Sequence, residues 1–149
     1  DWSSDVCSSD LEQRSGIDCG SWGGILSNGA KARGVAGVIA DGPVRDVDEA
    51  RALDFPVFGR SATARTARNR ILEAGTDVPV AIGDVTVNPG DYALADGSAV
   101  VFVAAAEAAR VIAAAETIAA REAAMTKDML AGNPASQVMG ANYEHMLKR

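Results

Sequence analysis

The sequence is poor in the features on which several classes of protein depend. Aromatic residues make up 5% of its 149 residues, too few for the stacking surfaces that bind nucleic-acid bases. The formal net charge of -6 argues against the basic face that a binder of the phosphate backbone needs. No apolar run approaches the roughly 20 residues of a membrane-spanning helix. We therefore expect neither a nucleic-acid partner nor a membrane partner.

Cysteine is also scarce, with Cys7 and Cys19 as the only two. Cys7 belongs to residues 1–11, "DWSSDVCSSDL", a polar and aperiodic stretch that resembles a translated sequencing adapter and lacks the apolar region of a signal peptide. We interpret it as a foreign leader, the alternative being a disordered polar leader. Residues 12–149 then form a single domain that lacks its native N-terminal part. Cys19 is left without an internal disulfide partner, which fits a reducing cytoplasm.

The middle of the chain alternates between helical and extended patterns. Turn residues such as Gly, Asn, Pro and Asp separate short apolar runs that are typical of strands. We expect a helix from about residue 25 to 33, a buried strand at 35–40, a helix within 44–54, a strand at 55–59, a basic loop or short helix at 61–77, and three or four strands within 78–103.

The last third is rich in alanine, the residue with the highest helix propensity. We expect one long helix from residue 104 to 131, with Val111, Ile118 and Met125 forming an apolar stripe. Gly132 is a typical helix stop, and the tail after Pro134 could form a further short helix. Strands alternating with helices predict an α/β sandwich in which helices flank a sheet.

Two glycines indicate where a ligand could bind. A helix that begins just after Gly23 and Gly24 would direct the unpaired amides of Ile25 and Leu26 outward, as an anion cradle that needs no side chain. Glycine also lets a ligand approach the backbone closely. The alternative is an ordinary turn.

A charged pair follows the strand predicted at 35–40. Arg45 offers a planar fork suited to a carboxylate, and Asp46 offers one hard oxygen ligand suited to Mg²⁺. Together with the amide cradle, they could hold a 2-oxo acid. The alternative is a surface ion pair that contributes little. We interpret Asp41, before Gly42, as a turn-former that ends the strand.

Several motifs occur in an order that resembles the RraA-like family: "WGGIL", "AKARGVAG", "DGPVRD", "FPVF" and "PGDYALAD". That family includes aldolases acting on 4-hydroxy-4-methyl-2-oxoglutarate and 4-carboxy-4-hydroxy-2-oxoadipate, which also decarboxylate oxaloacetate. The resemblance implies a swivelling β/β/α sandwich that assembles as homotrimers or hexamers, with active sites between subunits.

The resemblance also assigns roles to single residues. Arg45 matches the arginine that grips the pyruvyl carboxylate and Asp46 the metal-binding aspartate, while Ile25 and Leu26 match the residues whose amides contact pyruvate. Glu122 lies where the family has a glutamate that reaches the neighbouring subunit's site. The implied protein is a cytoplasmic lyase that uses Mg²⁺ or Mn²⁺ to cleave C–C bonds of small 2-oxo acids, giving pyruvate.

The sequence departs from the aldolases at two positions. Gly24 stands where they carry an acid between the turn glycine and the two aliphatics, and their lysine after "FPVF" has no counterpart among Arg65, Arg68 and Arg70. Both departures leave the substrate open. In the branch that regulates ribonuclease E, the metal-binding aspartate is typically replaced. Asp46 therefore favours an enzyme over the alternative, a non-catalytic oligomer that binds a protein partner.

Overall fold

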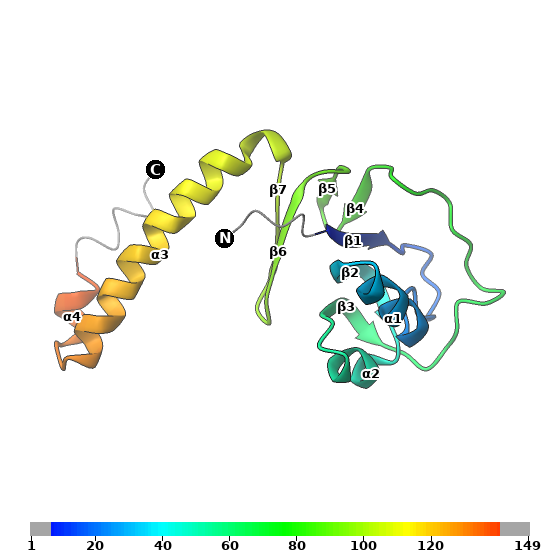
Figure 1. Cartoon of the computed structure of the whole chain (residues 1–149), viewed down its shortest axis with the longest axis horizontal. Coiled ribbons are helices and arrows are strands. Elements are labelled where there is room, and N and C mark those ends of the chain that lie inside the picture. The colour runs from blue at the N-terminus through cyan, green and yellow to red at the C-terminus, as the bar shows by residue number, and fades with distance from the viewer. Residues whose placement is uncertain (1–6, 141–149) are drawn as a thin grey trace. The chain divides into compact units, whose positions relative to one another are not determined.

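The computed structural model describes residues 7–140, which belong to two compact units that meet in the sequence at Ala104 and Ala105 (Figure 1). The first unit contains β1 (Cys7–Glu12), α1 (Gly24–Ala32), β2 (Val35–Val44), α2 (Val47–Ala52), β3 (Val57–Ala62), β4 (Val80–Ile82), β5 (Val85–Val87), β6 (Tyr92–Ala95) and β7 (Val100–Val103). The second contains the 3-10 helix η1 (Ala105–Glu107), α3 (Ala108–Leu130) and α4 (Ala135–Val138). This is the predicted α/β class, with a long C-terminal helix.

A three-stranded parallel sheet of order β1-β2-β3 forms the centre of the first unit. Each step to the next strand passes through one helix, first α1 and then α2. Because parallel crossovers are right-handed and both steps run in the same direction, the two helices lie on one face of the sheet. They contact each other, as this arrangement requires.

The middle strand β2 supplies most of the core. Residues 37–42 and Val44 are buried, so both faces of this strand are covered. Val38 is completely inaccessible, and Phe55 from the turn before β3 is also buried. A continuous buried run is typical of a parallel strand with neighbours on both faces. The apolar pattern of the sequence therefore predicted this strand correctly.

The prediction that Asp41 forms a turn that ends the strand is wrong. β2 continues through Asp41 to Val44, and its register with β3 shifts between Ala40 and Pro43. The Asp41 side chain is only 6% exposed, and Arg60 of β3 pairs with it. The backbone N–H of Gly83 donates to Asp41 Oδ2 over 2.9 Å. These partners satisfy the buried carboxylate, so the strand tolerates it.

The edge strand β1 was not predicted. It pairs in parallel with β2, from Cys7 opposite Val35 to Glu12 opposite Asp41. This pairing describes conformation only, so the foreign origin of residues 1–11 stays a prediction, and residues 1–6 lie outside the described part of the chain.

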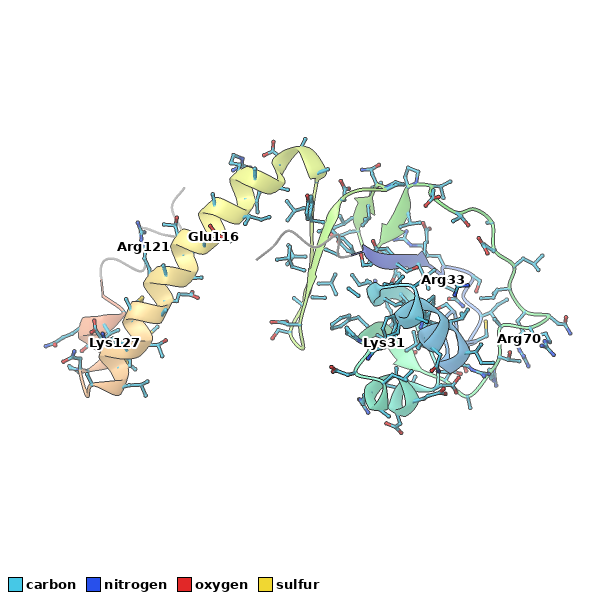
Figure 2. The ribbon with its side chains drawn as sticks, viewed as in Figure 1. Lys31, Arg33, Arg70, Glu116, Arg121 and Lys127 are labelled. Carbon is cyan, nitrogen blue, oxygen red and sulfur yellow. The ribbon has the colours of Figure 1, made fainter. Side chains whose placement is uncertain are left out.

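The remainder of the first unit follows the predicted pattern. Residues 63–79 form an irregular loop that carries Arg70 (Figure 2). Two antiparallel hairpins follow, β4 with β5 and β6 with β7, which gives four strands within the predicted range. β4 contacts β1.

The second unit is dominated by α3, which confirms the predicted long helix. Gly132 ends it with a positive φ of 90°, as expected for a residue just past a helix C-terminus. Val111 and Met125 of the apolar stripe are half-buried, whereas Ile118 is exposed. Charged side chains such as Glu116, Arg121 and Lys127 project from the helix (Figure 2). Within residues 7–140, no helix combines the length and the apolar character needed to cross a membrane.

Candidate active site

Arg45, Asp46 and the glycine turn before α1 meet at the carboxyl end of β2. Arg45 and Asp46 directly follow Val44, the last residue of that strand. Ligands of open α/β sheets bind at this end of parallel strands. Backbone hydrogen bonds join this end of β2 to the turn before α1 and to the segment after β3. On the first side, Ser21 N–H donates to Pro43 O over 2.9 Å and Arg45 N–H donates to Trp22 O over 3.0 Å. On the second side, Thr63 N–H donates to Val44 O over 2.9 Å.

The N-terminus of α1 forms one wall of the site. Gly23 is the residue that precedes the first helical turn. Ser27 is buried, and its hydroxyl donates to Gly23 O over 3.2 Å while accepting the Trp22 indole N–H over 2.9 Å. The amides of Ile25 and Leu26 donate to no acceptor within residues 7–140. The helix therefore presents two free amides, as the anion cradle requires.

Asp46 bridges this wall to Arg45. The Gly24 N–H donates to Asp46 Oδ2 over 2.9 Å, and Arg45 Nε donates to the same oxygen over 3.0 Å. The pKa of the Asp46 carboxyl lies below its usual value. The hydrogen bond from the Gly24 amide is the largest cause, and the hydrogen bond from Arg45 adds to it. Asp46 has a φ of 57°, a strained conformation for a residue with a side chain. This conformation directs its carboxylate to α1.

Close packing explains why the turn before α1 contains glycine. A Cβ on Gly23 would lie 3.0 Å from Asp46 Oδ2 and 3.1 Å from Arg45 Nε. A Cβ on Gly20 would lie 2.8 Å from Arg45 Cγ. A larger residue at either position would require the side chain of Arg45 or Asp46 to shift, so these glycines let the arginine lie along the turn.

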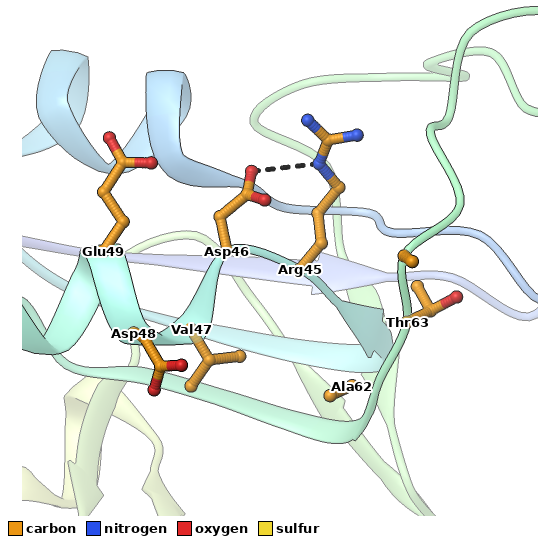
Figure 3. A pocket seen from close by; sticks show the side chains of 8 residues that line it. Arg45, Asp46, Val47, Asp48, Glu49, Ala62 and Thr63 are labelled. Atoms are coloured by element: carbon orange, nitrogen blue, oxygen red, sulfur yellow. Dashed lines mark hydrogen bonds and ion pairs between the residues drawn. The ribbon is translucent and has the colours of Figure 1, made fainter.

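An open pocket of about 550 Å³ adjoins the pair and is lined by residues of α2 and of the segment after β3. Figure 3 shows the side chains of Arg45, Asp46 and Glu49 on one side, with Val47 and Asp48 turned to the other. Glu49 was not among the residues predicted from the sequence. The available signal was its place in the first turn of α2, where the helix dipole favours acidic residues.

The donor chemistry at this site fits Mg²⁺ or Mn²⁺. Within residues 7–140, no group of three or more His, Cys, Asp and Glu side chains gathers as a metal cluster. Mg²⁺ needs no such cluster, because it keeps several waters and takes only one or two carboxylates from the protein. Both hydrogen bonds to Asp46 described above end on Oδ2, which leaves Oδ1 for a cation.

The structure brings together only some of the predicted residues. Ile25 and Leu26 lie at the α1 N-terminus with exposed side chains, as expected if only their amides act. Arg65 pairs with Asp18 over 3.7 Å. Glu122 lies exposed on α3 in the second unit, so its role in a neighbouring subunit's site stays a prediction.

The fold and the site define an α/β protein in which the N-terminus of α1 and the Arg45-Asp46 pair meet at the carboxyl end of the parallel sheet. The chain belongs to the RraA-like family, described as Aldolase/RraA, whose pattern it matches over residues 9–102. It is 34% identical over 118 residues to the protein MJ0644 of Methanocaldococcus jannaschii, covering 79% of this chain and 56% of that protein. A protein of Deinococcus radiodurans named "Putative 4-hydroxy-4-methyl-2-oxoglutarate aldolase" is 41% identical over 81 residues, covering 54% of this chain and 49% of its own length.

Solved structures support the same assignment. A protein from Pseudomonas syringae pv. tomato superimposes with a TM-score of 0.82 at 32% identity, covering 91% of this chain and 66% of that one. RraAS2 of Streptomyces coelicolor, described as an unusual member of the RNase ES inhibitor RraA family, gives a TM-score of 0.68 at 28% identity, covering 74% and 56%. In each comparison the chain spans less than two thirds of the relative's own length.

Proposed function

We propose that this chain carries the site of a metal-dependent lyase that cleaves a C–C bond in small 2-oxo acids and releases pyruvate. The substrates in view are 4-hydroxy-4-methyl-2-oxoglutarate, cleaved by a retro-aldol step, and oxaloacetate, cleaved by decarboxylation. The observation that carries the proposal is that Asp46 Oδ2 accepts both the Gly24 N–H at the α1 N-terminus and Arg45 Nε.

The chain's own residues divide the work of binding. The guanidinium of Arg45 suits the carboxylate of a 2-oxo acid. The amides of Ile25 and Leu26 face the same carboxylate or the adjacent oxo group. The Gly24 amide and Arg45 lower the pKa of the Asp46 carboxyl, so this side chain stays anionic even below the usual range of an aspartate and can bind a cation. A bound Mg²⁺ or Mn²⁺ would supply positive charge that offsets the negative charge developing on the 2-oxo group.

Both reactions leave the same product fragment. When the C–C bond breaks, its electron pair stays on the pyruvyl carbon and delocalises onto the oxo oxygen, and this carbon then takes a proton. From oxaloacetate the departing group is CO₂. From 4-hydroxy-4-methyl-2-oxoglutarate it is a second pyruvate, which forms as the 4-hydroxyl group loses its proton and becomes a carbonyl. One arrangement of fixed positive charge and amides therefore serves both substrates.

The proposal is tested by pyruvate release from oxaloacetate and from 4-hydroxy-4-methyl-2-oxoglutarate, with Mg²⁺ and with EDTA. We expect EDTA to abolish turnover and Asp46→Ala and Arg45→Ala each to lower kcat/KM by about 100-fold or more. Arg51→Ala is the control, because Arg51 forms an exposed pair with Asp48 on α2. Turnover that survives both site substitutions, or that EDTA leaves unchanged, contradicts the proposal.

The second candidate is a protein-binding regulator, which the structural similarity to RraAS2 favours. This function predicts a complex with a ribonuclease of the RNase E kind and no need for a metal. Pull-down with such a ribonuclease, in EDTA and in Mg²⁺, separates the two functions. Binding without any lyase activity would favour the regulator.

The proposed enzyme is a cytoplasmic homotrimer or hexamer in which Glu122 completes the site of the next subunit. Support comes from the exposure of Glu122 and of most of α3. Light scattering after size exclusion measures the assembly. Mixing Glu122→Ala chains with Arg45→Ala chains tests the shared site, because mixed oligomers would regain activity.

A further inference from the structure

We infer that Arg65 binds the second carboxylate of the substrate and that it thereby favours the retro-aldol substrate over oxaloacetate. The inference rests on the proposed function, because it names a specificity-determining residue for that site. Arg65 directly follows the segment 62–64, which lines the pocket beside Arg45 and Asp46. Thr63 of this segment is among the side chains drawn at the pocket in Figure 3.

The backbone of Arg65 is fixed beside the glycine turn that precedes α1. Gly20 N–H donates to Arg65 O over 2.9 Å, and Arg65 N–H donates to Thr63 Oγ1 over 3.3 Å. The side chain of Arg45 lies against the same glycine, since a Cβ on Gly20 would be 2.8 Å from Arg45 Cγ. Both arginines therefore contact Gly20, one through its backbone and the other through its side chain.

The guanidinium of Arg65 is available to a ligand. Its side chain is 64% exposed, and Arg65 Nη1 lies 3.7 Å from Asp18 Oδ2, whose side chain is 58% exposed. A distance of 3.7 Å is too long for a hydrogen bond, and an ion pair this exposed contributes little. Among residues 7–140 the guanidinium makes this one ion pair and donates no hydrogen bond. A substrate carboxylate can therefore replace Asp18 at little cost.

The charge of the pocket explains why the substrate needs a second cation. Three acids line it, namely Asp46, Asp48 and Glu49, and Arg45 is the one basic residue in its described lining. Arg45 Nε already donates to Asp46 Oδ2. Oxaloacetate and 4-hydroxy-4-methyl-2-oxoglutarate each carry two carboxylates, so the end that Arg45 does not bind would face negative charge without compensation. Arg65, beside the lining segment, supplies that compensation.

The two substrates use their second carboxylate differently. In the retro-aldol reaction it departs intact within the second pyruvate, so a guanidinium bound to it stabilises the substrate and the transition state alike. In the decarboxylation of oxaloacetate the carboxylate itself leaves as neutral CO₂, while the electron pair of the breaking C–C bond moves to the 2-oxo group. A guanidinium bound to this carboxylate stabilises the substrate more than the transition state and slows the reaction.

The ordinary alternative is that Arg65 only joins its loop to Asp18. In that case Asp18→Asn and Arg65→Ala should change the kinetics in the same direction. Our inference predicts opposite directions, because the loss of the Asp18 charge frees the guanidinium for the substrate. For Asp18→Asn we expect the KM for 4-hydroxy-4-methyl-2-oxoglutarate to fall by about twofold.

The test measures steady-state pyruvate release from both substrates in Mg²⁺. For Arg65→Ala with 4-hydroxy-4-methyl-2-oxoglutarate we expect KM to rise about 10-fold while kcat stays within about twofold, as for the loss of one hydrogen bond between charged groups. With oxaloacetate we expect KM to rise as well, but kcat to increase about threefold or more. This difference between the two substrates is a result that a merely structural role would not produce.

Two further variants serve as controls. Arg68→Ala removes the next arginine of the same loop, which is exposed and does not line the pocket, and should change each constant by less than about twofold. Arg65→Lys keeps the charge but not the planar fork, so it should recover part of the affinity lost in Arg65→Ala. Circular dichroism melts verify the fold of each variant, and Arg65→Lys carries the test if Arg65→Ala does not fold.

The outcomes separate this inference from the proposed function. The role of Arg65 is refuted if Asp18→Asn raises KM as Arg65→Ala does, or if Arg65→Ala lowers kcat for both substrates. It is also refuted if the wild type releases pyruvate and Arg65→Ala leaves every constant unchanged, a result with which the metal-dependent function stands. If the wild type releases pyruvate from neither substrate, both the function and the role of Arg65 are refuted.

Discussion

Replacing Asp41 by Asn should destabilise the first unit, although Asp41 is not part of the proposed site. Its side chain joins segments that are distant in the sequence. Arg60 of β3 pairs with it, Arg14 Nε lies 3.5 Å from Oδ2, and the Gly83 N–H donates to Oδ2 over 2.9 Å. These contacts hold the turn between β4 and β5 against the three-stranded sheet.

The magnitude follows from the exposure of the partners. Hydrogen bonds to charged groups contribute about 1.5–3 kcal/mol each when buried. The Asp41 side chain is 6% exposed, but those of Arg60 and Arg14 are 60% and 48% exposed, so water screens much of their attraction. Asn retains an oxygen for the Gly83 amide. We therefore expect Asp41→Asn to lower the free energy of unfolding by about 2 kcal/mol.

Urea unfolding followed by tryptophan fluorescence measures this loss, with Trp22 as a probe within the first unit. Asp48→Asn is the matched control, because Asp48 is 96% exposed and pairs with the exposed Arg51. For the control we expect a loss below about 0.5 kcal/mol. If Asp41→Asn costs no more than Asp48→Asn, the buried carboxylate does not hold these segments together and the reasoning fails.

The stability difference between the wild type and Asp41→Asn should also depend on pH. Arg60, with a smaller contribution from the Gly83 amide, lowers the pKa of the Asp41 carboxyl in the folded protein. A lowered pKa means that the stabilisation is complete above the unfolded pKa, about 3.9, and disappears as pH falls through the lower folded value. The stability difference between wild type and Asp41→Asn should therefore be constant at neutral pH and shrink below about pH 4. A difference that grows on acidification would contradict the assignment.

The remaining predictions concern the wall of the site. Ser27→Ala should lower the free energy of unfolding by about 1–2 kcal/mol, because it leaves the Trp22 indole N–H without its acceptor. A red shift in tryptophan fluorescence would report the change. An unchanged spectrum and an unchanged stability would show that this bond is dispensable. Gly23→Ala should lower kcat/KM for oxaloacetate by about 10-fold or more, because its Cβ would crowd Asp46 and Arg45. Ala at the exposed Gly97, where a Cβ meets nothing within 4 Å, is the control, and equal rates for the two variants would refute the crowding argument.

The local pattern was enough to predict much of the fold. The apolar run around Val38 predicted β2, the alanine-rich stretch predicted α3, and the glycines before Ile25 predicted the start of α1. Each of these signals depends on neighbours in the sequence, such as propensity, period and turn residues. The pairing of Arg45 with Asp46 near the α1 N-terminus was likewise predicted, because the candidate residues lie at the ends of predicted elements.

Contacts between distant segments explain the errors. The position of Asp41 before Gly42 suggested a turn, but Arg60 and Gly83 satisfy its carboxylate inside a strand. Residues 7–12 have a polar sequence with no strand period, and only their hydrogen bonds to β2 make them extended. Polarity alone could not predict either outcome, because each depends on a partner that the fold supplies.

The sequence by itself determined the class of fold, the positions of the main helices and strands, and the chemistry available at Arg45 and Asp46. The tertiary structure decided which other groups join them. Gly24 looked like the loss of an acid, but packing of α2 against α1 brings the carboxylate of Glu49 into the space that Gly24 leaves open. A missing side chain is visible in the sequence, whereas the group that fills its volume is fixed only when two helices pack together.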